Sequence, residues 1–265
     1  MSILSKILEA KRKEVSDMPE ISDDFICNRK SFIEALRSEK PAFIAEIKPK
    51  SPSVGNILSS EAIPEIVKTY NDSATAISVL CDEKFFGGGF DLLLQVSAQT
   101  DKPLLAKEFV ISEKQVMQAV INGASAILLI AAILEMTDLI KLIRKASSVN
   151  LSILLELHSV DDIEKASSAM KELAKEERQR IVFGINNRNL DSLNISLETT
   201  AQLAPKVKSI ITDNNLLISE SGIKSAEDIH KLSTFVDGFL IGTSILQSSD
   251  FKSFFSSLKT ACNQK

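Results

Sequence analysis

Eight short apolar runs recur along the 265-residue chain at intervals of about 20 to 35 residues, and nearly every run ends in a polar residue or a glycine. The residues at these ends are Glu46 and Lys48, Lys107, Glu156, Asn186, and Glu220 with Ser221 and Gly222. Apolar strands that alternate with amphipathic helices are typical of a parallel sheet covered on both faces. Eight such units predict an α/β fold closed into a (β/α)8 TIM barrel, whose chemistry lies at the carboxyl ends of the strands.

An open doubly wound sheet is the structural alternative. It would usually carry a glycine-rich turn after its first strand. The segment that follows the first run, KPKSPSVGN, has no such pattern.

The pattern predicts one domain over residues 1–265, with an N-terminal helical extension at 1–40 and the barrel at 41–265. Strands are expected at 43–48, 76–80, 103–107, 126–130, 152–157, 181–185, 216–220 and 238–241. Helices are expected at 3–15, 31–37, 60–70, 90–98, 112–121, 137–147, 160–177, 197–203, 225–232 and 251–262. Ser112, Thr137 and Ser225 stand just before acidic or amide residues, as capping residues at helix starts do.

Composition narrows the function. The net charge is −4 without a large basic block, which argues against nucleic acid as a partner. Cys27, Cys81 and Cys262 are widely spaced and form no metal-binding pattern, so we expect reduced thiols and no metal. The N-terminus has no secretory apolar segment, and the longest apolar stretch, 124–134, is far short of the roughly 20 residues of a membrane span. We therefore expect a cytoplasmic, soluble monomer that takes a phosphorylated small molecule.

Alternation along the strands predicts which side chains enter the barrel mouth. Glu46 and Lys48 share a face with Ile44, and we expect them to point inward as a pair that keeps each group ionised. A buried salt bridge that only fills the mouth is the alternative.

The same alternation turns Lys107, Glu156 and Asn186 inward. A lysine among apolar neighbours can have a lowered pKa and serve as a general acid, so Lys107 is the first candidate for that role. Two carboxylates, two lysines and an amide thus converge on one mouth.

Two late turns suggest a phosphate site. Ser221 and Gly222 follow the seventh strand, and Gly242 and Thr243 follow the eighth. Loops at these positions of a barrel commonly bind phosphate through backbone N–H groups, and glycine permits close approach. Two ordinary glycine turns are the alternative.

Three further features have weaker meaning. Residues 85–89, FFGGG, predict a mobile loop over a flat substrate ring, with an ordinary surface loop as the alternative. His158 should alternate away from Glu156, and His230 lies in a helix, so neither is a candidate for catalysis.

The chain also resembles a known family. The strings FIAEIKPKSPSVGNI, ISVLCDEKFFGGGFDLL, PLLAKEF, GASAILLIAAIL, LLELHS, GINNRNLDSLNISLETT, ISESGI and FLIGTSIL occur in this order between residues 43 and 246. They resemble the indole-3-glycerol phosphate synthases, which also carry an N-terminal helical extension. The strings that begin at Ala45, Asp82 and Gly184 are the most specific.

The resemblance implies an enzyme of tryptophan biosynthesis that needs no cofactor. It would convert 1-(2-carboxyphenylamino)-1-deoxyribulose 5-phosphate to indole-3-glycerol phosphate, CO2 and water. The implied catalytic residues are Lys107 as general acid on the sugar oxygen, Glu156 for proton movement in the dehydration, Lys48 near the substrate carboxylate, its neighbour Glu46, and Asn186 on the reacting hydroxyls. The implied binding residues are Ser51, Ser221, Gly222, Gly242 and Thr243 for the phosphate, Phe86 for the ring, and Arg188 and Glu220 as supporting polar groups.

Departures from the family pattern occur at Pro49, Ala106, Glu108 and Ser125, and they bear on efficiency rather than identity. Two other functions remain open. A phosphoribosylanthranilate isomerase-like enzyme would need a Cys/Asp pair where this chain has Glu46 and Glu156. A catalytically silent phosphosugar-binding barrel would be expected to lose its inward charges. The sequence does not decide whether the protein forms weak contacts with pathway enzymes, and such contacts are compatible with the synthase and with the isomerase-like enzyme.

Overall fold

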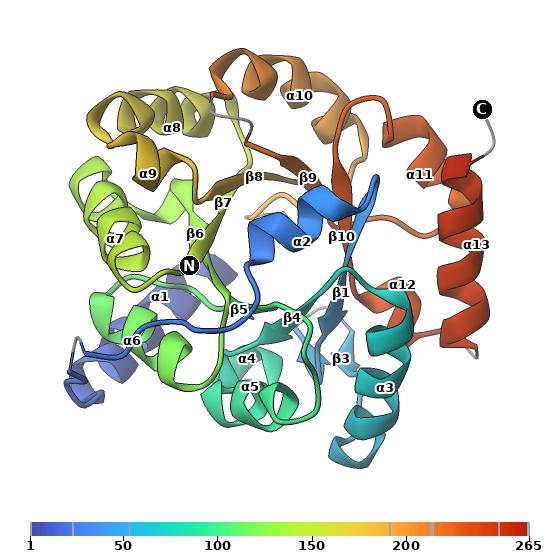
Figure 1. Ribbon diagram of the computed structural model, residues 1–265, viewed down its shortest axis with the longest axis horizontal. Helices are drawn as coiled ribbons and strands as arrows, with labels where there is room; N and C mark the ends of the chain where they lie inside the picture. The colour runs from blue at the N-terminus through green and yellow to red at the C-terminus, as the bar shows by residue number, and fades with distance from the viewer. Residues whose placement is uncertain are drawn as a thin grey trace.

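A computed structural model describes residues 2–22, 24–52, 54–190, 192–212, 215–248 and 250–263. Eight parallel strands form a closed barrel in the order β1-β10-β9-β8-β7-β6-β5-β4 (Figure 1). Their bounds are β1 (Ala42–Ile47), β4 (Ala76–Leu80), β5 (Leu104–Lys107), β6 (Ala126–Ile130), β7 (Ser152–Leu157), β8 (Ile181–Asn186), β9 (Leu217–Glu220) and β10 (Gly238–Ile241). The predicted strands agree with these bounds to within one residue, and the closed (β/α)8 barrel is confirmed.

Helices surround the barrel as a ring (Figure 1). The longer ones are α3 (Ile63–Ser73), α5 (Phe90–Ser97), α6 (Glu113–Ile121), α7 (Met136–Ser148), α8 (Val160–Glu172), α10 (Glu198–Ile210), α11 (Ala226–Leu232) and α13 (Phe251–Asn263). The short elements are the hairpin of β2 (Lys50–Ser51) and β3 (Gly55–Asn56), η1 (Ser60–Ala62), α4 (Glu83–Phe86), η2 (Ala131–Ile133), α9 (Lys175–Arg178) and α12 (Thr243–Leu246). Within the described ranges, every helix is too short or too polar to cross a membrane.

Alternation along each strand separates two apolar layers, as expected for a barrel. In β1, Phe43, Ala45 and Ile47 belong to the layer between strands and outer helices, whereas Ile44 belongs to the barrel interior. Leu105 and Leu154 also lie inside. The predicted inward and outward faces of these strands are confirmed.

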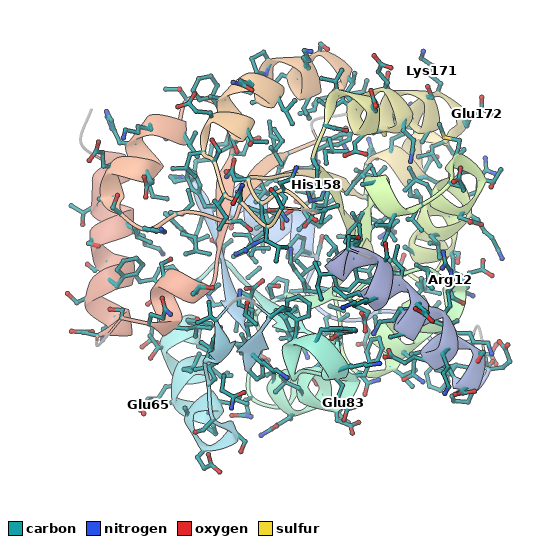
Figure 2. The ribbon with its side chains drawn as sticks, turned by 180° about the vertical axis from the view of Figure 1, so that it is seen from behind. Arg12, Glu65, Glu83, His158, Lys171 and Glu172 are labelled. Carbon is teal, nitrogen blue, oxygen red and sulfur yellow. The ribbon has the colours of Figure 1, made fainter. Side chains whose placement is uncertain are left out.

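The two helices of the N-terminal extension cover opposite ends of the barrel. On α2 (Phe32–Ser38), the apolar residues Phe32, Ile33 and Leu36 pack with Ala42, Ala76 and Ala126 at the amino ends of the strands. On α1 (Ile3–Asp17), Ile3, Leu4 and Ile7 line a cavity at the carboxyl ends. Figure 1 shows α2 across the near opening of the barrel. Figure 2, from behind, shows that α1 begins beside the other opening and runs outward to the right.

Some helix boundaries differ from the prediction. Ser112 and Ser225 cap α6 and α11 through capping boxes, as expected. The prediction for Thr137 is wrong, because α7 begins one residue earlier and Glu135 occupies the N-cap position. The predicted helix 160–177 is interrupted at Leu173, which is extended and buried. Helix α10 continues through Pro205, although proline usually disrupts a helix interior.

Aromatic packing joins the first and last strands where the barrel closes. The Phe43 ring lies 6.1 Å from that of Phe239 and 5.9 Å from that of Phe255, measured between centroids. The Tyr70 ring lies 6.1 Å from Phe255, and its hydroxyl donates to the carbonyl of Glu46 at 3.2 Å. Helices α3 and α13 are thereby fixed to β1, the strand that carries the first predicted site residues.

Phe43→Ala should lower the free energy of unfolding by about 3–5 kcal/mol, because truncation of a fully buried ring leaves a cavity. The matched control is Phe25→Ala, since the Phe25 side chain is 52% exposed and buries little surface. Urea unfolding of both variants measures the difference. Equal stabilities would contradict the assignment of Phe43 to the closure of the barrel.

Candidate active site

One cavity of about 730 Å³ opens at the carboxyl ends of the barrel strands. The predicted site residues that line it are Glu46, Lys48, Ser51, Phe86, Lys107, Glu156, Asn186, Arg188, Ser221, Gly222, Gly242 and Thr243. The remaining one, Glu220, is fully buried and contacts Lys107. The structure thus brings all the predicted site residues to one place.

Lys107 is the centre of the charged groups in this cavity. Its Nζ lies 2.7 Å from Oε2 of Glu220 and 3.1 Å from Oε2 of Glu156. Burial lowers the pKa of Lys107, but the charges of Glu156, Glu220 and Glu46 outweigh burial and raise it. The expectation of a lowered pKa was therefore wrong, because carboxylates rather than apolar groups surround the ammonium.

The two glutamates that share Lys107 differ in their affinity for a proton. Burial raises the pKa of Glu156, but the Lys107 charge and contacts with His158 and Asn186 lower it overall. Burial, together with repulsion from Glu156, outweighs Lys107 and raises the pKa of Glu220 to about 8. Two adjacent buried carboxyls do not both ionise readily, so the pair holds a proton on Glu220 in preference to Glu156.

Glu46 and Lys48 form the predicted pair at the end of β1. Lys48 Nζ donates to Glu46 Oε1 at 2.5 Å. Burial raises the pKa of Glu46, but Lys48 and Lys107 lower it overall, so the carboxylate stays ionised as expected. A Cβ on Gly242 would lie 2.3 Å from Glu46 Oε1, which gives this glycine a packing role beside its predicted role in binding.

His158 is the residue that the sequence prediction misplaced. It was expected to face away from the site, but its Nε2 lies 3.1 Å from Glu156 Oε1, and its side chain is only 10% exposed. Burial lowers the pKa of His158, whereas Glu156 and Asp162 raise it overall. Figure 2 places His158 over the middle of the barrel. The strand ends at Leu157, so alternation no longer holds at this position.

Phe86 lies on a short helix rather than in the predicted loop. The Asp82 Oδ1 accepts from the backbone N–H groups of Phe85 and Phe86 at 2.7 and 3.1 Å and so caps α4. The Phe86 ring faces that of Phe109 across the cavity wall, with centroids 6.1 Å apart. A Cβ on Gly88 would lie 1.8 Å from the carbonyl of Leu80, so this position requires glycine for close packing.

The predicted phosphate loop has an unusual backbone. Ser221 and Gly222 both have positive φ, 67° and 87°, and only glycine adopts such angles without strain. The Asn187 amide donates to the Ser221 carbonyl and to Ser219 Oγ, both at 3.0 Å. Asn187, which the prediction omitted, thus supports the strained turn, and its place beside Asn186 in the GINNRNL string was the available signal.

Asn186 and Arg188 are held by contacts in the segment after β8. Asn186 Oδ1 accepts from the backbone N–H of Arg188 at 3.0 Å, so its amide nitrogen is the end available to other groups. That nitrogen donates to the Glu156 carboxylate. The Arg188 guanidinium donates to the carbonyl of Leu193 at 3.4 Å, which fixes the loop that borders the cavity.

Comparisons with known proteins identify the family. The family described as "Indole-3-glycerol phosphate synthase" matches residues 4–258. The chain is 35% identical to indole-3-glycerol phosphate synthase of Prochlorococcus marinus over 270 residues, which cover 97% of this chain and 89% of that protein. This chain belongs to the indole-3-glycerol phosphate synthase family.

Other relatives are longer or more distant. "Tryptophan biosynthesis protein TrpCF" of Vibrio parahaemolyticus is 36% identical over 256 residues, which cover 94% of this chain and 51% of that protein. The chain therefore spans about half the length of this relative. The solved structure of 3-hexulose-6-phosphate synthase from Salmonella typhimurium has a TM-score of 0.63 at 10% identity and covers 84% of this chain and 99% of its own. That likeness shows the barrel fold.

The departures from the family pattern lie mostly outside the cavity. Ala106 belongs to the outer apolar layer. Ser125 accepts from the N–H of Leu104 at the amino ends of the strands, far along the barrel from the site. Glu108 Oε2, in contrast, lies 3.0 Å from Nζ of Lys11 on helix α1. Burial outweighs the Lys11 charge and raises the pKa of Glu108 to about 7.

Glu108 should make stability fall as pH rises from about 4.5 to 7, because the folded state holds its proton where the unfolded chain has lost it. Glu108→Gln removes this dependence. We therefore expect the melting temperature of the variant, relative to the unchanged protein, to increase over this pH range. Thermal melts across the range measure this, and a pH-independent difference would contradict the raised pKa.

Proposed function

We propose that the chain converts 1-(2-carboxyphenylamino)-1-deoxyribulose 5-phosphate to indole-3-glycerol phosphate, CO2 and water. The observation that carries the proposal is the position of the Lys107 ammonium in the cavity wall, 3.1 Å from Glu156 and 2.7 Å from Glu220. The pKa of Glu156 is lowered and that of Glu220 is raised, so the two carboxyls differ in their hold on a proton. Such a group supplies both an acid and a base to one substrate. Membership of the family gives the substrate class.

In the first step, the ring carbon that bears the carboxylate attacks the ketone carbon. One C–C bond forms, and the ketone oxygen takes a proton from Lys107. The raised pKa of Lys107 keeps the group charged until the oxygen becomes strongly basic. Glu220 Oε2 is 2.7 Å from Nζ and can return a proton to the lysine.

Loss of CO2 then restores the aromatic ring, as the C–C bond to the carboxylate breaks and its electrons return to the ring. We assign the carboxylate to the neighbourhood of Lys48. Glu46 holds the Lys48 ammonium in place at 2.5 Å. Because CO2 leaves without a charge, the Lys48 ammonium needs only to orient the carboxylate. It can do so while it stays paired with Glu46.

The final step is a dehydration. The new hydroxyl leaves as water with a proton from Lys107, and the adjacent methylene carbon loses a proton to a base. Glu156 is the base, because its depressed pKa keeps it ionised beside Lys107. His158, 3.1 Å from the other oxygen of Glu156, orients this carboxylate.

The remaining residues bind the two ends of the substrate. Phe86 contacts the aromatic ring of the substrate. Asn186 contacts the sugar hydroxyls, and Arg188 supports the adjoining loop. Ser51, Ser221, Gly222, Gly242 and Thr243 hold the phosphate, and all of them line the same cavity. Binding through a remote phosphate orients the reacting carbon.

The alternatives fit the geometry less well. An isomerase-like acid–base pair has no cysteine at the ends of β1 and β7, where Glu46 and Glu156 stand. A silent phosphosugar-binding barrel has no need for a buried lysine held between carboxylates, which costs desolvation free energy. Tight binding of the product without turnover would favour that second alternative.

The test is a fluorescence assay of the formation of indole-3-glycerol phosphate with the purified chain and this substrate. Lys107→Met should abolish turnover, with a loss of at least about 100-fold, while binding of a phosphate ligand persists. Lys141→Met, which changes a side chain that is 64% exposed, is the matched control and should keep full activity. Turnover by the Lys107 variant would refute its role as the acid.

The rate should fall above about pH 8, since Glu220 loses its proton there and the ammonium can no longer be recharged. Glu220→Gln should lower kcat about 100-fold and remove this alkaline decline. Glu227→Gln, at a side chain 76% exposed, is the control for the same exchange outside the cavity. An alkaline decline that persists unchanged in the Glu220 variant would assign it to another group.

A further inference from the structure

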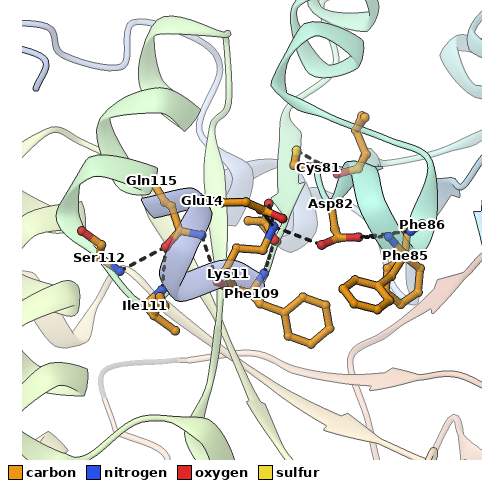
Figure 3. A network of polar contacts seen from close by, with 12 residues as sticks. Lys11, Glu14, Cys81, Asp82, Phe85, Phe86, Phe109, Ile111, Ser112 and Gln115 are labelled. Atoms are coloured by element: carbon orange, nitrogen blue, oxygen red, sulfur yellow. Dashed lines mark hydrogen bonds and ion pairs between the residues drawn. The ribbon is translucent and has the colours of Figure 1, made fainter. Parts of the chain in front are cut away.

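The Lys11 side chain of helix α1 is buried at the carboxyl ends of the barrel strands. The Lys11 side chain is only 1% exposed, although α1 lies outside the ring of strands. Its Nζ lies 2.6 Å from Glu14, 3.0 Å from Asp82 Oδ2 and 3.0 Å from Glu108 Oε2 (Figure 3). None of these residues takes part in the chemistry proposed above.

Asp82 and Glu108 each use their other oxygen to fix a loop of the cavity. Asp82 Oδ1 accepts from the N–H groups of Phe85 and Phe86, and Glu108 Oε1 accepts from the N–H of Phe109 at 2.6 Å. Phe86 and Phe109 line the cavity, with ring centroids 6.1 Å apart. Lys11 therefore joins the two carboxylates that orient the two rings.

The cation is needed for this arrangement. Asp82 and Glu108 are 0% and 2% exposed, and without a cation the negative charge of these two carboxyl groups would be buried without a partner. The same helix contributes Ile3, Leu4 and Ile7 to the cavity wall. Loss of the Lys11 charge would thus displace both aromatic rings and the apolar wall together.

We propose that Lys11 is a positioning residue for the aromatic end of the substrate, acting through Asp82 on Phe86 and through Glu108 on Phe109. The effect on catalysis rests on the proposed function, whereas the effect on the two loops does not. A lysine that only stabilised the fold would change the melting temperature and leave the kinetics of the folded enzyme unaltered.

The experiment compares Lys11→Met with Arg12→Met, the neighbouring exposed position on the same helix. Hydrogen exchange is measured at the amides of Phe85, Phe86 and Phe109, which need no turnover to be observed. We expect Lys11→Met to speed exchange at these amides by at least about tenfold, with no change in Arg12→Met. KM should rise about 10- to 100-fold with a smaller change in kcat.

Lys11→Arg keeps the positive charge and should restore part of the affinity. If Lys11→Met does not fold, Asp82→Asn replaces it: this variant should loosen the Phe85 and Phe86 amides and leave that of Phe109 protected. Unchanged exchange, or unchanged KM in a variant with faster exchange, would overturn the proposal. If the unchanged protein has no turnover, the proposed function fails, and faster exchange together with weaker binding of anthranilate would still support the positioning role.

Discussion

The arrangement of the cavity depends on one ammonium group that several buried carboxylates share. Lys107 on β5 contacts Glu156 on β7 and Glu220 on β9, and its charge also acts on Glu46 of β1. Removal of one member would leave charges buried without partners, which is costly in a protein interior. The groups come from strands distributed around the barrel, so only a closed sheet brings them together. Fold and chemistry are therefore linked through the same contacts.

Close packing around Lys107 and the neighbouring carboxylates explains two glycines better than chain flexibility does. A Cβ on Gly184 would lie 2.1 Å from Oε1 of Glu220, and one on Gly242 would lie 2.3 Å from Oε1 of Glu46. Each glycine makes room for a carboxylate of a neighbouring strand. The carboxylates around Lys107 thus require glycine at both positions. Asn187 supports the strained turn at Ser221 by a hydrogen bond to the Ser221 carbonyl.

Local patterns in the sequence were sufficient for the strands and for the direction of their side chains, because apolar runs and alternation are properties of neighbouring residues. They failed where distant residues decide. Alternation predicted that Lys107 and Glu156 share the mouth, but Lys107 was expected to have apolar neighbours. Its contacts with Glu156 and Glu220 span 49 and 113 positions along the chain. His158 follows the end of β7, where alternation stops, and the contact of Lys11 with Glu108 spans 97 positions. No local pattern contains these contacts.

We propose that Lys107, Glu156 and Glu220 together hold one carboxyl proton at neutral pH. Carbon-13 NMR of glutamate carboxyls, recorded between about pH 5 and 10, tests it directly when the spectra of the unchanged protein and Glu220→Gln are compared. We predict one resonance that titrates near pH 8 and is missing from the variant. A Glu220 carboxyl that is already ionised at about pH 5, close to the pKa of about 4.3 of a free glutamate, would contradict this proposal.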